Sequence, residues 1–249
     1  MKKLGMILHA LFAACVFVGT PPCVLADTNT IRSTSSQLMT YHIKHPRGAF
    51  YSYTGGDPSA RLPPKREPIV NQLSVPHGSI NVAANKTVSA SDKYPIMGEL
   101  SFLTDTNKSG EDKTILEIMP GKQWIQIDLG ETCEVYAIAM WRHIRTWGPK
   151  VYHDVVILLS DDAQCTKNPR TIFNNDHDNS IGMGKGTDSE YQEDYGGKVI
   201  TCFKGDKHGR RCRYVRIWSN GEDNKFFEVE VIGRPTSKTI DSHLETQTK

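Results

Sequence analysis

The sequence predicts an all-β protein whose strands form an antiparallel β-sandwich of the jelly-roll type. Between Ile80 and Gly233, short segments alternate apolar and polar residues with a period of two, which is typical of strands with one buried and one solvent-facing side. Turns rich in Gly, Asn and Asp separate these segments, and no stretch of ten or more residues has the apolar period of a helix. Such a succession of short strands favours two facing sheets around one core.

In three segments the apolar side chains fall on one face, and we expect them in the core: Ile125, Ile127 and Leu129; Val215 and Ile217; Phe227, Val229 and Val231. Glu228 and Glu230 lie on the opposite face of the last segment, which we expect to be solvent-facing. Residues 155–159 are apolar on both faces and predict a central strand that is covered on both sides. Further strands are expected at 87–90, 135–141, 171–173 and 198–203.

Residues 1–26 have the pattern of a cleaved export signal. Two lysines precede the apolar stretch 4–18, and the sequence Val-Leu-Ala at 24–26 suits signal peptidase. The apolar stretch is shorter than the roughly 20 residues that a membrane-spanning helix needs. A lipoprotein signal that uses Cys15 is the alternative. We expect the mature chain to be secreted, periplasmic or at the cell surface.

The charge balance excludes several classes of function. The chain has 249 residues, with 30 Lys and Arg, 28 Asp and Glu and a formal net charge of +2. Removal of residues 1–26 takes away two lysines, so the remaining 249 − 26 = 223 residues carry 28 basic and 28 acidic side chains. Without a surplus of Lys and Arg, the chain is not suited to nucleic acid or to an anionic membrane. No second apolar stretch of spanning length follows, so we expect no transmembrane segment in the mature chain.

The mature chain is expected to have three parts. Residues 27–77 form a polar leader or linker in which closely spaced prolines remove the backbone donors that a sheet needs. Residues 78–234 form the β-sandwich domain. Residues 235–249 form a polar tail.

Four of the six cysteines remain after removal of the signal: Cys133, Cys165, Cys202 and Cys212. An even number in an oxidising compartment suggests disulfides, and three pairings are possible. We favour Cys202–Cys212, because these two residues flank a short turn-rich segment, and this choice leaves Cys133–Cys165. A zinc site is not indicated, because no Cys-x-x-Cys is present and no histidine has zinc-finger spacing from the cysteines.

Several motifs occur in an order that resembles a known family. They are Asn-Val-Ala at 81–83 with Thr-Val-Ser-Ala-Ser at 87–91, Leu-Thr-Asp at 103–105, Gln-Trp-Ile-Gln-Ile-Asp-Leu-Gly at 123–130, Leu-Ser-Asp-Asp at 159–162, Arg-Tyr-Val-Arg-Ile at 213–217 and Glu-Val-Glu-Val-Ile-Gly at 228–233. With this order and spacing the chain resembles the discoidin domain, or coagulation factor 5/8 type C domain, a galactose-binding-like jelly roll. The version with the polar run at 173–179 is similar to those of exported bacterial proteins.

The resemblance implies binding rather than catalysis. Bacterial domains of this family are mostly carbohydrate-binding modules of secreted or surface proteins, and some relatives bind lipid headgroups or proteins. Many carry one structural Ca²⁺, which on this chain would be held by four residues: Asp105, Asn107, Thr114 and Glu228. The family usually has Gly where this chain has Thr106, and a β-branched residue resists the positive φ that Gly adopts freely. The resemblance therefore leaves two alternatives, a calcium site or a differently bent polar turn with an exposed Glu228.

A second candidate site is the run 141–147 at the end of an expected strand. Sugars present apolar C–H faces and rings of hydroxyl groups, so a binding site pairs an aromatic platform with donors such as Arg and His. This run offers Trp141, Arg142, His143, Arg145 and Trp147. The alternative is that one Trp fills the core while the arginines cover the edge of the sandwich.

Behind this run we expect a loop with the residues Asn175, Asp176 and His177 to contact the ligand. The loop does not match an EF-hand, because no Gly occupies the sixth position. The alternative is a structural loop, since Asn and Asp side chains close turns against their own backbone.

Catalysis is not indicated. The motifs Gly-x-Ser-x-Gly and His-Glu-x-x-His are absent, and nothing singles out a glycosidase pair such as Asp176 with Glu190. The sequence predicts a secreted non-catalytic module that recognises a glycan or cell-surface polysaccharide through loops at one end of the jelly roll. The alternative is a cell-surface adhesion or assembly module that binds an envelope protein.

Overall fold

The computed structural model describes residues 37–46, 70–109, 114–142, 150–193, 196–203, 208–222 and 224–237. The chain divides into two units, Met1–Ser35 and Ser36–Lys249. The first unit, and with it the predicted signal at 1–26, lies outside the described residues. Within the described ranges, no helix is long and apolar enough to cross a bilayer.

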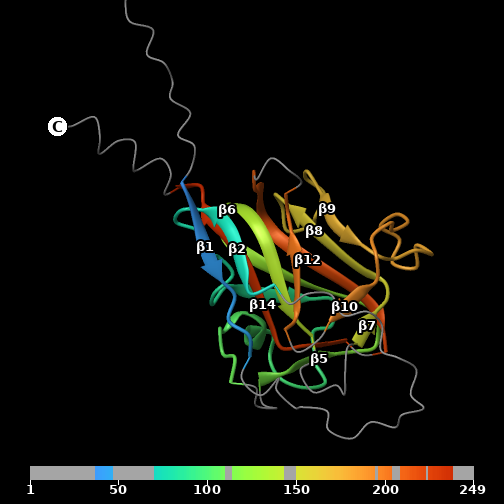
Figure 1. The fold of residues 1–249 in the computed structure, drawn as a ribbon. Coiled ribbons are helices and arrows are strands. Elements are labelled where there is room, and N and C mark those ends of the chain that lie inside the picture. Colours follow the sequence, from blue (N-terminus) through green and yellow to red (C-terminus); the bar gives the residue numbers. More distant parts are fainter. Residues whose placement is uncertain are drawn as a thin grey trace, which may run out of the picture. The chain divides into compact units, whose positions relative to one another are not determined.

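The second unit is built from strands (Figure 1). In chain order they are β1 Leu38–His42, β2 Gln72–Pro76, β3 Ile80–Asn81, β4 Thr87–Ala90, β5 Leu116–Ile118, β6 Gly121–Trp141, β7 Lys150–Tyr152, β8 Val155–Ser160, β9 Arg170–Asn174, β10 Tyr191–Glu193, β11 Lys198–Thr201, β12 Arg210–Gly221, β13 Asn224–Phe226 and β14 Glu228–Pro235. A short 3-10 helix, η1 Leu100–Thr104, lies between β4 and β5.

One large sheet joins most of these strands. Its order is β3-β14-β6-β12-β8-β9, and β4 and β11 also pair with β6. Smaller two-stranded sheets are formed by β1 with β2, β7 with β10, and β5 with β13. Every pairing among the described strands is antiparallel. The predicted all-β, antiparallel fold is confirmed.

The long strand β6 joins the other strands of the large sheet. Its first half pairs with β4 and β12, and its second half pairs with β14 and β11. Gly130 lies between the halves with a φ of 83°, a conformation that glycine adopts without steric cost, and its N–H donates to Asp128 Oδ1 at 2.8 Å. The register of β12 against β6 shifts close by, between Cys212 and Tyr214. The two halves of β6 therefore meet near Gly130 and differ in their other partner strands.

The main core lies between the layers and contains most of the residues that the alternation predicted. All eight predicted residues are 1% exposed or less: Ile125, Ile127, Leu129, Val215, Ile217, Phe227, Val229 and Val231. The predicted central strand is also confirmed, because β8 is buried along its whole length and pairs with β12 on one side and β9 on the other.

The prediction that Glu228 and Glu230 face solvent is wrong. Their relative exposures are 0% and 8%, because the second face of β14 is covered as well. A second apolar cluster lies on this side and includes Phe227 just before β14, Ile232 of β14 and Trp141 of β6. Burial of two glutamates on one strand is costly unless each finds a cation or a proton.

Part of the predicted leader provides this cover. Strands β1 and β2 pair with Met39 opposite Val75, and Leu73 and Val75 are buried in the second cluster. Pro76 ends β2, where its missing N–H does not interrupt a ladder. The segments 38–42 and 72–76 therefore pack on the sandwich, whereas residues 47–69 lie outside the described residues.

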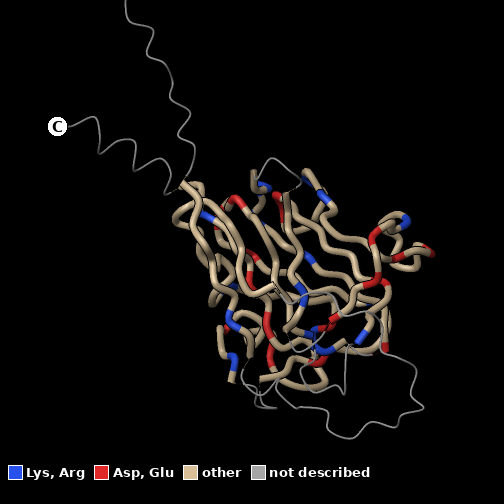
Figure 2. Tube along the Cα trace, viewed as in Figure 1, with Lys and Arg blue, Asp and Glu red and all other residues tan. Residues whose placement is uncertain are grey.

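Charged side chains are interspersed along the described trace (Figure 2). Many of them join neighbouring strands as ion pairs, such as Arg213 with Asp128 at 2.8 Å and Arg234 with Glu134 at 3.0 Å. The Asp128 carboxylate also has a lowered pKa because Arg213 donates to it. Part of the balanced charge of the sequence is therefore paired within the fold.

Candidate functional site

Trp141 was predicted to be a sugar platform, and the structure contradicts this. Strand β6 continues through Trp141, and the indole is 1% exposed in the second apolar cluster. The ammonium of Lys108 lies 3.9 Å from its ring centroid, and His45 packs against its edge at 6.1 Å. The indole thus fills a core, which was the alternative that the sequence left open.

Arg142 is also 1% exposed and cannot contact a ligand directly. Its guanidinium lies between the rings of Tyr152 and Phe226, with centroid distances of 4.0 and 4.7 Å, and donates to Ser219 Oγ at 3.0 Å. Its backbone N–H donates to Glu193 Oε1 at 2.7 Å. The side chain is a structural cation of the core. The other members of the predicted run, His143, Arg145 and Trp147, lie outside the described residues.

The predicted ligand contacts Asn175 and Asp176 are buried as well, with exposures of 2% and 0%. The Asn175 amide accepts from Val155 N and donates to Tyr152 O, both at 2.8 Å. The Asp176 carboxylate accepts from the backbone N–H groups of Ser180 and Ile181, both at 2.9 Å. These bonds make 174–181 a self-closed structural loop, and the prediction that these two residues bind a ligand is wrong.

His177 is the exposed member of this predicted group. Its Nε2 lies 2.9 Å from Asp188 O, so the ring is tied to the same loop. The carboxylates of Asp154, Asp176 and Asp178 also approach one another here, with one oxygen of each within 4.8 Å of the others. Because both Asp176 oxygens already accept N–H groups, the cluster is explained by loop closure.

Glu228, the first residue of β14, is one of the four residues that the resemblance assigns to calcium. Its carboxylate is fully buried, and neither oxygen has a hydrogen-bond partner within the described part of the chain. Burial raises the pKa of Glu228 to about 9, with the charge of Lys108 opposing this and that of Asp105 adding to it. A carboxylate with two free oxygens in a dry site, and a second carboxylate near it, fits a hard cation such as Ca²⁺.

Asp105 follows η1 and belongs to the loop that faces Glu228. Its Oδ1 accepts from Asn107 N at 2.7 Å, and Asn107 Oδ1 accepts from Ser109 N at 3.1 Å. Thr114 is buried at 3% on the far side of the same loop. The four predicted residues therefore come from the loop after η1 and the start of β14.

Thr106 takes a φ of 64°, the left-handed conformation in which the family has Gly. The expectation that a β-branched residue would bend this loop differently is therefore wrong. The two Asx-type bonds of Asp105 and Asn107 hold the turn around it. Such a conformation costs about 1–3 kcal/mol in a residue other than Gly and persists where the surroundings impose it.

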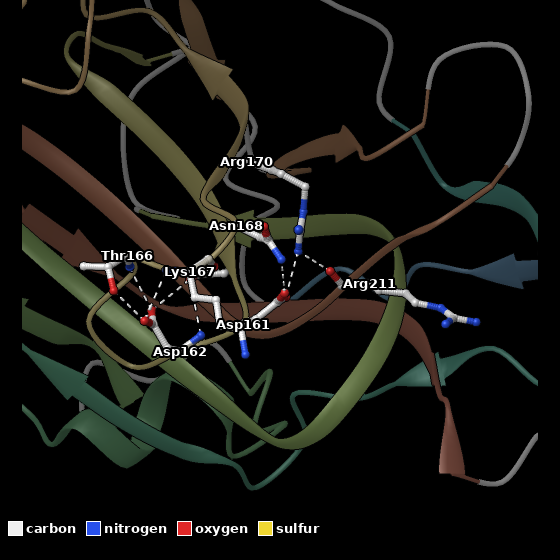
Figure 3. Close-up of polar contacts among 8 residues, drawn as sticks. Asp161, Asp162, Thr166, Lys167, Asn168, Arg170 and Arg211 are labelled. Carbon is white, nitrogen blue, oxygen red and sulfur yellow. Dashed lines mark hydrogen bonds and ion pairs between the residues drawn. The ribbon is translucent and has the colours of Figure 1, made fainter.

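The Ser-Asp-Asp motif closes the β8–β9 connection (Figure 3). The Asp162 carboxylate accepts from Thr166 N at 2.8 Å, Thr166 Oγ1 at 2.6 Å and Lys167 N at 3.1 Å. Donation by Thr166 is the main cause that lowers the pKa of Asp162 to about 2. Asp161 accepts from Asn168 and Arg170, and Arg170 also donates to the carbonyl of Arg211. The motif is structural.

All four described cysteines are free thiols. Cys133 lies directly opposite Cys212 in the β6–β12 register, whereas Cys165 Sγ lies 3.3 Å from Gln126 Oε1. Neither the favoured Cys202–Cys212 disulfide nor the Cys133–Cys165 disulfide that this choice left is formed in this structure. Sequence spacing could not reveal that β6 and β12 bring Cys133 and Cys212 face to face.

The structure reveals a surface feature that the sequence analysis missed, which we call the indole strip: Trp124, Trp218, Arg216 and Lys122. Trp124 and Trp218 are register partners on β6 and β12, half-buried, with ring centroids 6.4 Å apart and edge to face. The Arg216 guanidinium lies 4.3 Å from the Trp124 ring, and the Lys122 ammonium lies 5.8 Å from the Trp218 ring. Both indoles occupy the polar-face positions of their strands, which was the sequence signal for surface placement.

Two loops border the indole strip. On one side, Ala163 O accepts from Gln126 Nε2 at 3.1 Å and from Arg216 Nη2 at 2.8 Å. On the other side, Asn220 Nδ2 donates to Ser180 Oγ at 3.0 Å, and Ile181 packs with Trp218. The strip is therefore a rigid aromatic and cationic surface between two fixed loops.

A second surface feature is an apolar patch formed by four exposed residues: Tyr94, Ile96, Met97 and Met119. The Asp92 carboxylate joins its two parts, because it accepts from Tyr94 N and from Met119 N, both at 2.9 Å. The backbone N–H groups of Ile96 and Met97 both donate to the carbonyl oxygen of Glu117. Tyr94 is 86% exposed, so this patch is a set of apolar loop tips.

No protein-family model and no curated protein matches the chain. Solved structures do match it. The likeness is to sugar-binding modules and lectins. Chitosan-binding module 1 of a chitosanase/glucanase from Paenibacillus sp. IK-5 has 24% identity and a TM-score of 0.42, over 61% of this chain and 98% of that one.

Two further structures show the range of this likeness. A fucose-binding module of Streptococcus pneumoniae, SpX-3, has 20% identity and a TM-score of 0.43, over 61% of this chain and 96% of that one. A fucolectin from the serum of striped bass, Morone saxatilis, has 16% identity and a TM-score of 0.42, over 63% of this chain and 50% of that one. These matches have discoidin-type, galactose-binding-like folds, the resemblance that the sequence indicates. At such identities and scores they carry no conclusion about a site.

Proposed function

We propose that the chain is an exported, non-catalytic carbohydrate-binding module. The observation that carries the proposal is the indole strip. A sugar ring stacks its C–H face on an indole, and its hydroxyl groups accept from cationic donors beside the ring. Trp124 and Trp218 supply two aromatic surfaces 6.4 Å apart, and Arg216 and Lys122 supply donors next to them.

The strip lies on β6 and β12 and not in the predicted end loops. It offers the same kind of contacts, aromatic rings beside cationic donors. Arg216 Nε donates to Gln126 Oε1 at 2.8 Å, so the guanidinium is held beside Trp124 before any ligand arrives. Side chains fixed in advance lose little conformational entropy on binding. A ready-made surface of this kind suits a weakly interacting, hydroxyl-rich ligand.

The decisive experiment is a glycan array followed by titration calorimetry with Trp124→Ala. We expect wild-type protein to bind at least one glycan class, and the variant to bind it at least tenfold more weakly, because a central aromatic contact is worth about 2 kcal/mol. Tyr94→Ala is the matched control, since it removes an exposed aromatic ring outside the strip. Thermal unfolding verifies that both variants fold. An array without any bound glycan, or unchanged binding by Trp124→Ala, contradicts the proposal.

The absence of catalysis is part of the proposal and rests on the carboxylates. Asp176, named above as a possible glycosidase acid, is fully buried and occupied by backbone N–H groups, and Glu190 pairs with His153 Nδ1 at 3.0 Å. Neither is poised to protonate a glycosidic oxygen. We expect no release of reducing ends from any glycan that the protein binds.

We infer further that Glu228 and Asp105 hold a structural Ca²⁺, with Asn107 and Thr114 as the other predicted ligands. The orphaned carboxylate of Glu228 supports this assignment. The ion would supply the positive charge that makes an ionised Glu228 tolerable in a dry site.

Export completes the proposal and rests on the sequence of residues 1–26. Mass spectrometry of protein recovered outside the cytoplasm is expected to find Asp27 as the first residue. A chain that keeps residues 1–26, or one that begins at Cys15 with a lipid attached, contradicts it.

The competing function is a module that binds an envelope protein at the cell surface. The apolar patch around Tyr94 favours it, because exposed patches of this kind mark protein contacts. Co-purification that survives Trp124→Ala and is lost with Tyr94→Ala would select this function over glycan binding.

A further inference from the structure

The two cations of the indole strip have no acidic partner within the described part of the chain. Arg216 donates to neutral oxygens, Gln126 Oε1 at 2.8 Å and Ala163 O at 2.8 Å. Lys122 is exposed and lies over the ring of Trp218, beside Gly182. Five described Lys and Arg side chains elsewhere have a carboxylate partner, among them Arg213 with Asp128 and Lys108 with Glu230. The strip therefore keeps uncompensated positive charge beside its aromatic rings.

Four carboxylates near the strip are engaged by donors of their own loops or of a neighbouring strand. Asp176 and Asp178 both accept from Ser180 N, at 2.9 Å, in the loop that borders the strip. Asp162 accepts from two residues of its own loop, Thr166 and Lys167. Asp128 accepts from Arg213 Nε at 2.8 Å and Nη2 at 3.0 Å. An anion that arrives at the strip would thus meet cations whose contacts are all neutral.

We propose that the ligand of the strip is an acidic glycan, one whose sugar units carry carboxylates, such as a uronate-containing polysaccharide. This inference rests on the proposed carbohydrate-binding function and specifies its substrate class. A uronate ring offers an apolar face to Trp124 or Trp218 while its carboxylate accepts from the adjacent Arg216 or Lys122. Arg suits this task, because its planar donors match the two oxygens of a carboxylate.

The selectivity of the strip follows from the same contacts. Esterification of the sugar carboxylate removes its charge and keeps the ring face and hydroxyl groups. A neutral glycan would therefore keep the stacking and lose the charge-assisted hydrogen bonds, which are about twice as strong as neutral ones. Binding of the acidic form should also weaken as salt is added, because exposed charges are screened within about 10 Å at 0.1 M salt.

The test uses the full chain and a matched pair of ligands, an oligogalacturonate and its methyl ester, measured by titration calorimetry at low salt. We expect the free acid to bind at least tenfold more tightly than the ester. Lys122→Gln should weaken binding of the acid by about tenfold and that of the ester by much less, because the amide of Gln can still donate to a hydroxyl group. Lys122 is exposed, so this variant is expected to fold normally. Lys44→Gln, an exposed lysine that follows Ile43 of the second apolar cluster, is the control and should bind like wild type.

The outcomes separate this inference from the proposed function. Equal binding of acid and ester that Trp124→Ala abolishes overturns the acidic ligand and keeps the glycan-binding strip. Acid binding that Lys122→Gln and Arg216→Gln both leave unchanged also overturns it. If no glycan of either kind binds, the proposed function fails together with the inference.

Discussion

The ammonium of Lys108 lies 2.7 Å from Oε1 of Glu230, two residues along β14 from Glu228. The same ammonium donates to Lys44 O at 2.6 Å and covers the ring of Trp141. One loop thus brings a cation to Glu230 and, three residues earlier, the carboxylate of Asp105 towards Glu228. Of the two glutamates buried on β14, Glu230 has an ammonium as partner, whereas neither oxygen of Glu228 has a hydrogen-bond partner among the described residues.

We expect calcium to stabilise the fold through Glu228. A ligand present at 100 times its Kd adds about 2.7 kcal/mol of stability, which for a domain of this size raises Tm by about 5–10 °C. Removal of Ca²⁺ with EGTA should lower the wild-type Tm by that amount. Glu228→Gln should abolish the difference, whereas Glu99→Gln, an exposed glutamate next to η1, should keep it. A wild-type Tm that is the same with Ca²⁺ and with EGTA contradicts the assignment.

Without metal, stability should fall as pH rises. The folded-state pKa of Glu228 is raised from its ordinary value of 4.5 to about 9, so between these values the folded state holds a proton that the unfolded state has released. Stability from this group is complete below pH 4.5 and is lost towards pH 9, at up to about 1.4 kcal/mol per pH unit. Urea midpoints in EDTA at pH 6 and pH 8.5 measure the slope. Glu228→Gln should flatten it, and a wild-type midpoint that rises over this range would contradict the pKa direction.

Arg142 should matter for stability rather than for ligand contact. Its guanidinium is enclosed by Tyr152 and Phe226 and bonds Ser219. Arg142→Ala removes a buried cation from its partners and should cost about 3–5 kcal/mol of unfolding free energy in urea titration. Lys150→Ala, at the half-buried start of β7, is a comparison for loss of a charge near the same ring. If Arg142→Ala folds with wild-type stability and loses only glycan binding, the residue belongs to a site after all.

The strands were predictable because the polarity of successive residues within each segment indicates which face of the strand is buried. In 124–129 each residue shows its face by its own polarity, and Ile125 and Ile127 are buried as the alternation requires. On β14 the same rule placed Glu228 on a solvent face, and it failed because the cover comes from β1, β2 and the loop after η1. These segments are distant in sequence, so no local period could reveal them.

The site residues were harder to predict because binding loops and polar cores use the same residue types. Trp141 and Arg142 read as a sugar platform by composition, yet β6 extends through Trp141 and places it in the second cluster. Trp124 had the better signal, an indole on the polar face of an alternating strand. Its neighbour Trp218 belongs to β12. The contact between the two indoles could therefore be predicted only once the register of β6 and β12 was known.

The reactivity of the thiols tests the register of β6 and β12, which places Cys133 opposite Cys212. Both residues and Cys202 are buried, and burial raises the pKa of Cys133 to about 11 and that of Cys202 to about 12. A thiol reacts as its thiolate, so these three should resist labelling in the folded, reduced protein. Cys165 is partly exposed and should react first with a disulfide reagent such as DTNB. We expect one thiol to be labelled quickly and the others only on unfolding, and Cys165→Ser to remove the fast phase. Two or more fast thiols in the wild type, or a fast phase that survives Cys165→Ser, would show that β6 and β12 do not shield their cysteines.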